Sequence, residues 1–219
     1  MLVSGGLDSA VALVEAAREG PVAPVYVRSG LVWEPAEMYW LERFLQTTGA
    51  PALVVLDLPV GDLYGAHWSL TGTDPPGSET PDEAVYLPGR NLLLLSKAGV
   101  WAVENDCASI VMGPLAANPF PDGTHAFFDA MGEAIGLAMG LGGPLPVETP
   151  LSGLSKAEVV RRAAGLPIAL TFSCLDPTPA HGHCGECNKC AERRRGFAEA
   201  GVDDPTEYAY GSRSGAGST

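Results

Sequence analysis

Basic residues are scarce in this chain of 219 residues. It contains 13 Lys+Arg against 26 Asp+Glu, which gives a formal net charge of −13. A protein that binds nucleic acid offsets phosphate charge with a basic surface, and its affinity follows the number of phosphates that it neutralises. So few cations leave little for such a surface, and we expect no nucleic-acid partner. An enzyme that acts on small molecules is compatible with this charge if it concentrates a few cations at its site.

A membrane-spanning segment is also missing. The longest apolar stretch, residues 92–103, is interrupted by Lys97 and is shorter than the ~20 residues that cross a bilayer. Met1 is followed by neither the basic segment nor the apolar region of a signal peptide. We therefore expect a cytoplasmic protein without a membrane partner. Because 46% of the residues are hydrophobic and 18% are charged, the composition excludes a disordered chain.

Short β-rich runs alternate with helical runs over most of the chain. Strands are predicted over residues 2–3, 24–27, 53–56 and 109–112, and helices over residues 9–18, 36–47, 91–103, 127–141 and 155–164. This alternation is typical of an α/β fold, here an open, Rossmann-like parallel sheet with crossover helices. Gly132, Gly136 and Gly140 recur every four residues in one helix, which favours close packing in a soluble protein over a membrane-helix dimer.

We divide the chain into three parts. Residues 1–170 are predicted to form the α/β domain, residues 171–210 a small metal-binding C-terminal segment, and residues 211–219 a disordered tail. Residues 71–83 have no apolar side chain to anchor them, so we expect a mobile loop there.

Four of the five cysteines crowd into the C-terminal segment with the spacing C-x9-C-x2-C-x2-C. They are Cys174, Cys184, Cys187 and Cys190. Clustered cysteines in a reducing compartment favour a metal over disulfides, and four thiolates suit one closed, structural Zn²⁺ site per chain. An iron–sulfur cluster is the alternative metal group, and redox cysteines are a further alternative. Cys107 stands alone and is interpreted as a buried apolar residue.

A glycine-rich turn joins the first strand to the first helix. Its residues are Ser4, Gly5, Gly6, Leu7, Asp8 and Ser9. Open α/β sheets bind ligands beyond the carboxyl ends of their strands, where backbone N–H groups, a helix N-terminus and hydroxyls can hold a phosphate chain. The turn lacks the Gly-Lys-Ser/Thr of a Walker loop and the G-x-G-x-x-G of a dinucleotide site. A glycine turn with a Ser/Asp helix cap is the simpler interpretation.

This hexapeptide resembles the SGGxDS motif of the PP-loop ATP pyrophosphatase superfamily. The resemblance implies that ATP is cleaved between its α- and β-phosphates, that a carbonyl or carboxyl oxygen is adenylated, and that the loop holds pyrophosphate. ATP with Mg²⁺ is then the expected co-substrate. Asp8 offers only acceptor oxygens when it is ionised, so it is a candidate to bind Mg²⁺ or to orient the loop.

Three further segments match one family in order and spacing. They are residues 86–91 (YLPGRN), residues 149–158 (TPLSGLSKAE) and residues 173–193, which hold the four cysteines. With the glycine-rich turn, they make the chain resemble the 7-cyano-7-deazaguanine synthase family of the queuosine pathway, also called the ExsB family, over nearly its whole length. The resemblance implies an adenine nucleotide alpha hydrolase-like fold and a homodimer.

The resemblance also implies an ATP-dependent carbon–nitrogen ligase. The carboxylate of 7-carboxy-7-deazaguanine would attack the α-phosphate of ATP, ammonia would displace AMP, and a second activation would convert the amide to the nitrile. Charge develops on phosphate oxygens in such steps, so we predict Arg90 and Lys156 as catalytic cations beside Asp8. Asn91 is expected to bind the base or ribose of the nucleotide. For Arg90 and Lys156 the alternative is an ordinary surface charge.

Two segments depart from the family pattern. Residues 26–34 (YVRSGLVWE) replace an Asp-Tyr-Gly-Gln-Arg-His run, and residues 120–125 (FPDGTH) replace a Tyr-Pro-Asp-Cys-Arg run. Two alternatives therefore stay open: a paralogue that adenylates a related carboxylate and forms an amide, and a non-catalytic, zinc-stabilised nucleotide-binding module. A tRNA-thiolating enzyme of the superfamily is disfavoured by the acidic charge and by the use of all clustered cysteines in the metal site.

Overall fold

A computed structural model describes residues 1–210, so the predicted tail lies outside the described residues. Its helices are α1 (Leu7–Glu19), α2 (Glu34–Thr48), α3 (Gly61–Tyr64), α4 (Trp68–Thr71), α5 (Arg90–Glu104), α6 (His125–Ala138), α7 (Lys156–Arg162) and α8 (Asn188–Ala200). The strands are β1 (Val25–Arg28), β2 (Val54–Asp57), β3 (Ile110–Val111) and β4 (Val147–Glu148), and the short 3-10 helices are η1 (Asp82–Val85), η2 (Pro121–Gly123) and η3 (Ile168–Leu170). Among these helices, none has the length and apolarity that a membrane crossing requires.

The first residues of the chain complete a parallel sheet. β1 pairs with β2, and β3 pairs with β4, both in parallel. Between these pairs, the Leu2 N–H donates to the Val111 carbonyl at 2.9 Å and the Val3 N–H donates to the Val25 carbonyl at 2.9 Å. The order across the layer is therefore β2, β1, residues 1–3, β3, β4. The predicted open, parallel α/β fold is confirmed, while β4, α3, α4 and α8 are additions to it.

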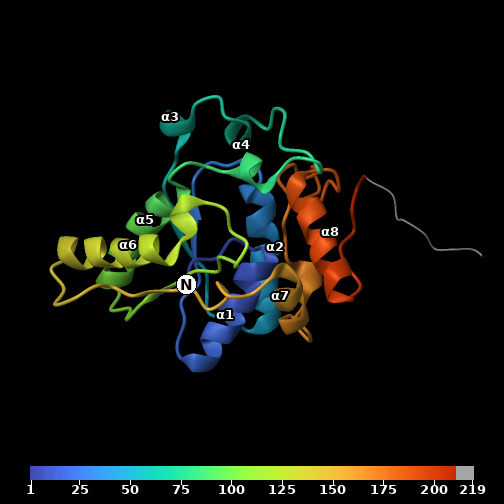
Figure 1. Cartoon of the computed structure of the whole chain (residues 1–219). Coiled ribbons are helices and arrows are strands. Elements are labelled where there is room, and N and C mark those ends of the chain that lie inside the picture. Colours follow the sequence, from blue (N-terminus) through green and yellow to red (C-terminus); the bar gives the residue numbers. More distant parts are fainter. Residues whose placement is uncertain (211–219) are drawn as a thin grey trace, which may run out of the picture.

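Helices cover both faces of this layer (Figure 1). Val3 and Tyr26 belong to one apolar core, which they share with α1, α2, α7 and α8. Leu2 and Val25 belong to a second core, which they share with α5 and α6. Successive side chains of a strand point to opposite faces, so neighbouring residues necessarily enter different cores.

The C-terminal residues pack on the rest of the chain at two places. α8 runs beside α7 and inserts Phe197 into the first core (Figure 1). The four clustered cysteines belong to a third core, together with Trp33 and Leu87. The domain boundary at residue 170 stays a prediction.

Residues 71–83, expected to form an unanchored loop, are fixed to the start of α8. The Asn188 N–H donates to the Pro76 carbonyl at 2.9 Å, and Asn188 Nδ2 donates to the Thr80 carbonyl at 2.8 Å. Pro76 itself is buried. The absence of an anchor was wrong, because a distant, fully buried asparagine holds the loop by hydrogen bonds that its apolar pattern cannot reveal. The mobility of the loop stays a prediction.

α6 approaches the following turn so closely that two of its glycines have no room for a side chain. A Cβ on Gly132 would lie 2.5 Å from the carbonyl oxygen of Leu145, and a Cβ on Gly136 would clash with the carbonyl oxygen of Gly143. Close packing at these two positions was predicted and is confirmed. Gly140 differs, because it lies beyond the helix with φ +68° and open space around it.

We expect Gly136→Ala to lower the free energy of unfolding by about 1–3 kcal/mol, because the added methyl group must displace backbone atoms in a packed region. Urea unfolding followed by circular dichroism measures the change. Gly142→Ala is the matched control, since a Cβ there meets nothing within 4 Å. Equal free energies of unfolding for the two variants would contradict the prediction, because they would show that the backbone at Gly143 can move aside without cost.

Candidate active site and metal centre

The glycine-rich turn of residues 4–9 closes tightly against α2. Gly5 has φ +74°, and a Cβ on it would lie 3.0 Å from the carbonyl oxygen of Glu37, so the position favours glycine on both counts. Ser9 Oγ donates to the Gly6 carbonyl at 3.0 Å and accepts the Ser4 N–H at 3.3 Å. Gly6 is the N-cap of α1, and no side chain caps that helix. The simpler interpretation, a Ser/Asp helix cap, is therefore wrong.

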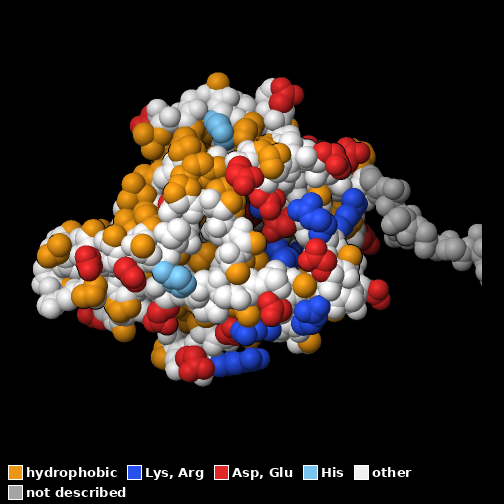
Figure 2. Space-filling model, in the orientation of Figure 1, with side chains coloured by type: hydrophobic (Ala, Val, Ile, Leu, Met, Phe, Trp, Pro, Cys, Tyr) orange, Lys and Arg blue, Asp and Glu red, His pale blue; other side chains and the backbone are white. Residues whose placement is uncertain are grey.

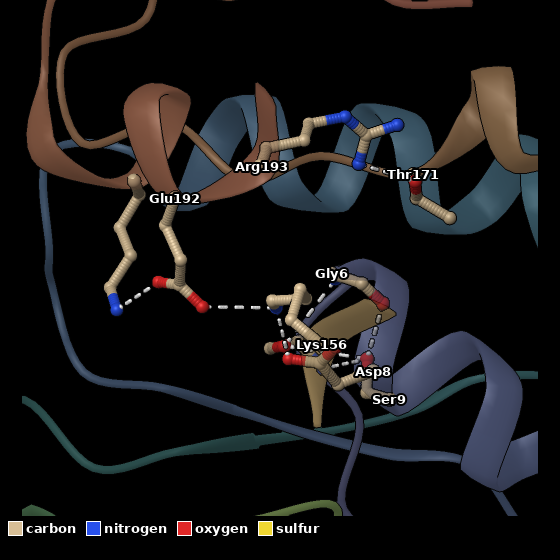
Figure 3. Close-up of polar contacts among 9 residues, drawn as sticks. Gly6, Asp8, Ser9, Lys156, Thr171, Glu192 and Arg193 are labelled. Carbon is tan, nitrogen blue, oxygen red and sulfur yellow. Dashed lines mark hydrogen bonds and ion pairs between the residues drawn. The ribbon is translucent and has the colours of Figure 1, made fainter. Parts of the chain in front are cut away.

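Asp8 begins a chain of ion pairs that runs through Lys156 of α7 to Glu192 and Lys189 of α8 (Figure 3). Lys156 Nζ lies 2.6 Å from Asp8 Oδ2 and 3.1 Å from Glu192 Oε1. The other oxygen of that carboxylate, Glu192 Oε2, lies 2.5 Å from Lys189 Nζ. These four side chains, the Asp8–Lys189 network, alternate in charge and sum to zero. Only 18% of the Lys156 side chain is exposed, so Lys156 is not an ordinary surface charge.

Opposite charges keep Lys156 and Glu192 ionised despite their burial. Burial disfavours the charged form of Lys156, but Asp8 and Glu192 outweigh it and raise the lysine pKa. Burial likewise opposes ionisation of Glu192, but Lys156 and Lys189 outweigh it and lower the glutamate pKa to about 2. A charge in this network is therefore stable only while its partners are in place.

The start of α7 puts Lys156 in position. Ser155 is the N-cap, and its hydroxyl accepts the Glu158 N–H at 3.3 Å. The Glu158 carboxylate in turn accepts the Ser155 N–H at 2.8 Å, which completes a capping box. The helix thus begins at Lys156 because its first turn is closed locally, and the lysine extends towards residues 4–9.

The network lines a cavity of about 360 Å³ beyond the carboxyl ends of residues 1–3 and β3. The predicted site residues on its wall are Ser4, Gly6, Leu7, Asp8, Ser9, Arg90, Asn91 and Lys156. The structure therefore brings the predicted nucleotide-binding and catalytic residues to one cavity, with Gly5 behind the wall. Its size is within the range of small-molecule sites, about 300–1,000 Å³.

Two buried polar atoms on this wall have no hydrogen-bond partner among the described residues: Asp8 Oδ1 and Arg90 Nε. One is an acceptor and the other a donor. Buried polar groups normally have hydrogen-bond partners. Asp8 Oδ1 is therefore suited to bind a cationic group of a ligand, and Arg90 Nε an anionic one. Asn91 next to Arg90 is partly engaged, because its side-chain amide donates to the Asp122 carbonyl at 2.8 Å.

The two segments that depart from the family pattern also reach the cavity. Tyr26, Val27 and Trp33 come from residues 26–34, and Phe120 comes from residues 120–125. Their rings stack on aromatic neighbours, Trp33 on Trp68 at 5.5 Å and Phe120 on Tyr86 at 5.0 Å between ring centroids. The surface is divided in a similar way into a charged and an apolar part. Figure 2 shows charged side chains over α7 and α8 and hydrophobic ones over α3 and α5.

A carboxyl group lies on the wall near these aromatic residues. Glu37 Oε2 accepts a hydrogen bond from the Tyr26 hydroxyl at 2.6 Å. Burial raises the pKa of Glu37 to about 7, although the Arg90 charge and the Tyr26 hydroxyl lower it. Burial also raises the pKa of Tyr26, so its hydroxyl stays protonated.

The four clustered cysteines are buried and fit one tetrahedral metal ion. Their Sγ atoms all lie within 4.8 Å of one another, and the pairs 184–190 and 174–187 are 3.9 Å apart. Zinc–sulfur bonds of about 2.3 Å at tetrahedral angles place the sulfurs ~3.8 Å apart. Each sulfur also accepts a backbone N–H, which stabilises a thiolate. The donors are the N–H groups of Leu175, Cys184, Gly185 and Glu186.

Other residues of the segment have separate partners. His183 Nε2 accepts the Ser173 N–H at 3.1 Å, beside the sulfurs. Cys107 is half-buried at the edge of the second core, so its interpretation as a buried residue was wrong. It follows the end of α5 in a tight turn, which leaves one side of the residue open to solvent.

α8 connects the cysteine cluster to the cavity. The helix begins directly after Cys187 and carries Cys190, Glu192 and Arg193 within its first two turns. Arg193 is buried and donates to the Thr171 hydroxyl at 2.9 Å, which ties α8 to the chain before the cysteines (Figure 3). A displacement of the cysteines would therefore move α8, and with it Glu192, the ion-pair partner of Lys156.

Comparison with known proteins decides the family. Residues 1–201 match a family described as queuosine biosynthesis protein QueC. The chain belongs to the QueC family. A 7-cyano-7-deazaguanine synthase of Methanopyrus kandleri is 37% identical over 226 residues, which cover 95% of this chain and 97% of the relative. One of Desulfatibacillum aliphaticivorans is 33% identical over 224 residues, which cover 95% of each. The resemblance read from the sequence is thus confirmed.

The fold of this QueC chain recurs in a solved structure. A protein described as a predicted subunit of tRNA methyltransferase from Methanocaldococcus jannaschii superposes with a TM-score of 0.50 and 15% sequence identity. The match covers 92% of the QueC chain and 86% of the other. At this identity the likeness shows the fold alone.

Three residues of the QueC cavity were missed from the sequence: Glu37, Lys189 and Glu192. For Glu37 a signal was available, because Leu41 and Phe44 follow it at helical spacing on the buried face of α2. A carboxyl group on that face is unusual enough to be noticed. Lys189 and Glu192 stand in a charged run that is indistinguishable from a solvated helix face.

Proposed function

We propose that this chain is an ATP-dependent carbon–nitrogen ligase that converts 7-carboxy-7-deazaguanine and ammonia to 7-cyano-7-deazaguanine. The observation that carries the proposal is the meeting of residues 4–9 with Lys156 and Arg90 at one cavity, in a member of the QueC family. A glycine-rich turn at a helix start, flanked by two cations, suits a reaction in which negative charge moves along a phosphate chain.

The turn is the proposed site of the ATP phosphates, the PP-loop of this chain. Its backbone N–H groups and the N-terminus of α1 would hold the pyrophosphate, with the hydroxyls of Ser4 and Ser9 close by. Asp8 Oδ1, buried and without a partner among residues 1–210, fits the oxygen ligand that Mg²⁺ prefers. Bound Mg²⁺ supplies charge neutralisation on the leaving phosphates.

The two cations have different proposed roles. Lys156 is held by Asp8 at 2.6 Å and would stabilise charge on the phosphates that the loop binds. Arg90 stands at the start of α5 with an unsatisfied Nε, and it would bind either the α-phosphate or the carboxylate that attacks it. Asn91 retains its side-chain oxygen for a base or ribose, since the amide nitrogen already donates to Asp122.

We further propose that the metal is Zn²⁺, one per chain, in a structural role. Four thiolates complete a tetrahedral shell and leave no open position for substrate. The 4.8 Å limit on the sulfur separations suits a single ion better than an iron–sulfur cluster. From the family resemblance we also propose a cytoplasmic homodimer; its acidic charge of −13 supports the absence of a nucleic-acid partner.

Product analysis tests the function. The protein is incubated with 7-carboxy-7-deazaguanine, ATP, Mg²⁺ and ammonia, and mass spectrometry follows the acid, the amide and the nitrile alongside AMP. We expect nitrile, with two AMP released for each nitrile formed, and no amide or nitrile when ammonia is left out. Amide as the final product would support the paralogue alternative. Absence of AMP with this acid would contradict the proposal and favour a binding module.

A further inference from the structure

Three carboxyl groups line the cavity among the described residues, and they differ in their partners. Asp8 and Glu192 both form ion pairs with Lys156, at 2.6 Å and 3.1 Å. Among residues 1–210, Glu37 forms no ion pair, and its carboxyl group has one hydrogen bond, which the Tyr26 hydroxyl donates. Of the three, Glu37 is therefore the one free to exchange a proton.

The proposed reaction needs such a group. When ammonia adds to the acyl adenylate, a carbon–nitrogen bond forms, AMP leaves with the electron pair of the carbon–oxygen bond, and nitrogen loses a proton. When the amide oxygen has been adenylated in turn, the second AMP leaves in the same way while two N–H protons depart and the nitrile forms. Both stages release protons from nitrogen, so a base beside the reacting carbon accelerates them.

The surroundings of Glu37 suit this exchange. Tyr26 from β1, Glu34 from α2 and Arg90 from α5 are the titratable or charged groups that act on it. Their balance with burial leaves the pKa of Glu37 at about 7, close to the value at which a general base is most effective near neutral pH. Lys156 stays charged at that pH, because Asp8 and Glu192 raise its pKa, and so it cannot accept a proton.

We propose that Glu37 is the general base of the amide- and nitrile-forming steps, accepting the protons that leave nitrogen and returning them to solvent between steps. This inference rests on the proposed function. It adds a third role to the cavity, beside phosphate binding by the PP-loop and charge stabilisation by the cations. Glu37 lies on the wall of the same cavity as Ser4, Asp8 and Arg90, which is where its carboxyl group could reach a substrate held by the loop.

The first test separates adenylation from amide formation in Glu37→Gln. Glutamine keeps the shape and can still accept the Tyr26 hydrogen bond, but it cannot take up a proton. We expect the ammonia-dependent rate to fall about 10²–10⁴-fold, the usual contribution of a general base. Acid-dependent exchange of pyrophosphate into ATP releases no N–H proton and should stay near the parent rate. Glu42→Gln, on the exposed side of the same helix, is the matched control.

The second test is the pH profile, with rates divided by the concentration of unprotonated ammonia so that its own titration cancels. The parent rate should rise with pH as Glu37 ionises and level off above about pH 7. The rate of Glu37→Gln should not show this rise with pH. The rate of Glu37→Asp should still rise with pH, but from a lower level. Tyr26→Phe removes a hydrogen bond that lowers the pKa of Glu37. The rate of this variant should therefore rise at a higher pH than the rate of the parent.

The outcomes separate this inference from the function on which it rests. An active parent whose Glu37→Gln variant keeps its ammonia-dependent rate, or keeps the rise with pH, would overturn the base assignment alone. Equal losses in exchange and in amide formation, in a variant whose thermal unfolding matches the parent, would overturn it in favour of a substrate-binding role. A parent that shows no exchange with the acid would contradict the proposed function, and the base assignment with it.

Discussion

Lys156→Met is expected to slow ATP-dependent pyrophosphate release about 10²–10³-fold, as when an enzyme loses one preorganised donor to a developing charge. Methionine retains much of the lysine stem but removes the ammonium that lies 2.6 Å from Asp8 and 3.1 Å from Glu192. The variant thus loses a cation at the phosphates, and two carboxylates lose a partner. The release of pyrophosphate measured with saturating acid and ATP reports the rate.

Two further variants show whether the charge or the structure is responsible. Lys156→Arg keeps the charge and should retain more activity than Lys156→Met. Arg162→Gln is the control, because Arg162 also lies on α7 but pairs with Glu15 of α1 at the surface. Breaking a fully buried pair costs about 3–5 kcal/mol, and less where the side chains are partly exposed. Thermal unfolding measures this cost. A Lys156→Met rate within a few-fold of the parent would remove Lys156 from the catalytic residues.

Removing the metal is expected to unfold the C-terminal residues and abolish activity together. Structural zinc sites bind with about 10–16 kcal/mol in small zinc-finger peptides, as much as the whole stability of a typical domain. Without the ion, four thiols face one another within 4.8 Å and lose their common partner. α8 then has no fixed start, and Glu192 and Arg193 leave their partners on α7 and at Thr171.

Cys190→Ser tests this without a chelator. We expect metal content to fall from about one ion per chain, helical circular dichroism to drop, and pyrophosphate release to be lost in the same samples. Cys107→Ser removes a thiol that is half-buried and apart from the cluster, so it should change none of these. Full activity in metal-free protein would show that Lys156 is positioned without α8.

The parts of the site that were predictable are those fixed by neighbours in sequence. The glycine-rich turn needs Gly5 at φ +74°, the capping box needs Ser155 and Glu158 three residues apart, and the cysteine spacing brings three thiols into one short segment. Each is decided within a few residues by backbone geometry or ligand reach. The positions of these features in the fold then follow from the strand–helix alternation.

The parts that escaped prediction depend on contacts between distant segments. Asn188 anchors residue 80 across 108 positions, and Lys189 and Glu192 join the site only because α8 packs beside α7. No periodicity in either segment encodes such a partner. β4 was missed for a similar reason: two residues, Val147 and Glu148, form a strand because β3 lies beside them.

The charge balance of the Asp8–Lys189 network bears on how the nucleotide arrives. Each lysine of the network is already neutralised by a carboxylate, so the network itself adds little attraction for an approaching polyanion, and Arg90 is the cation on the cavity wall without an ion pair among residues 1–210. The chain as a whole, at −13, repels the polyanion. Long-range steering is thus unfavourable, and ions in solution shield the approaching anion from the protein beyond a Debye length of about 8 Å. The association rate constant of the nucleotide should therefore increase with ionic strength. Enzymes that attract their substrates electrostatically show the opposite dependence.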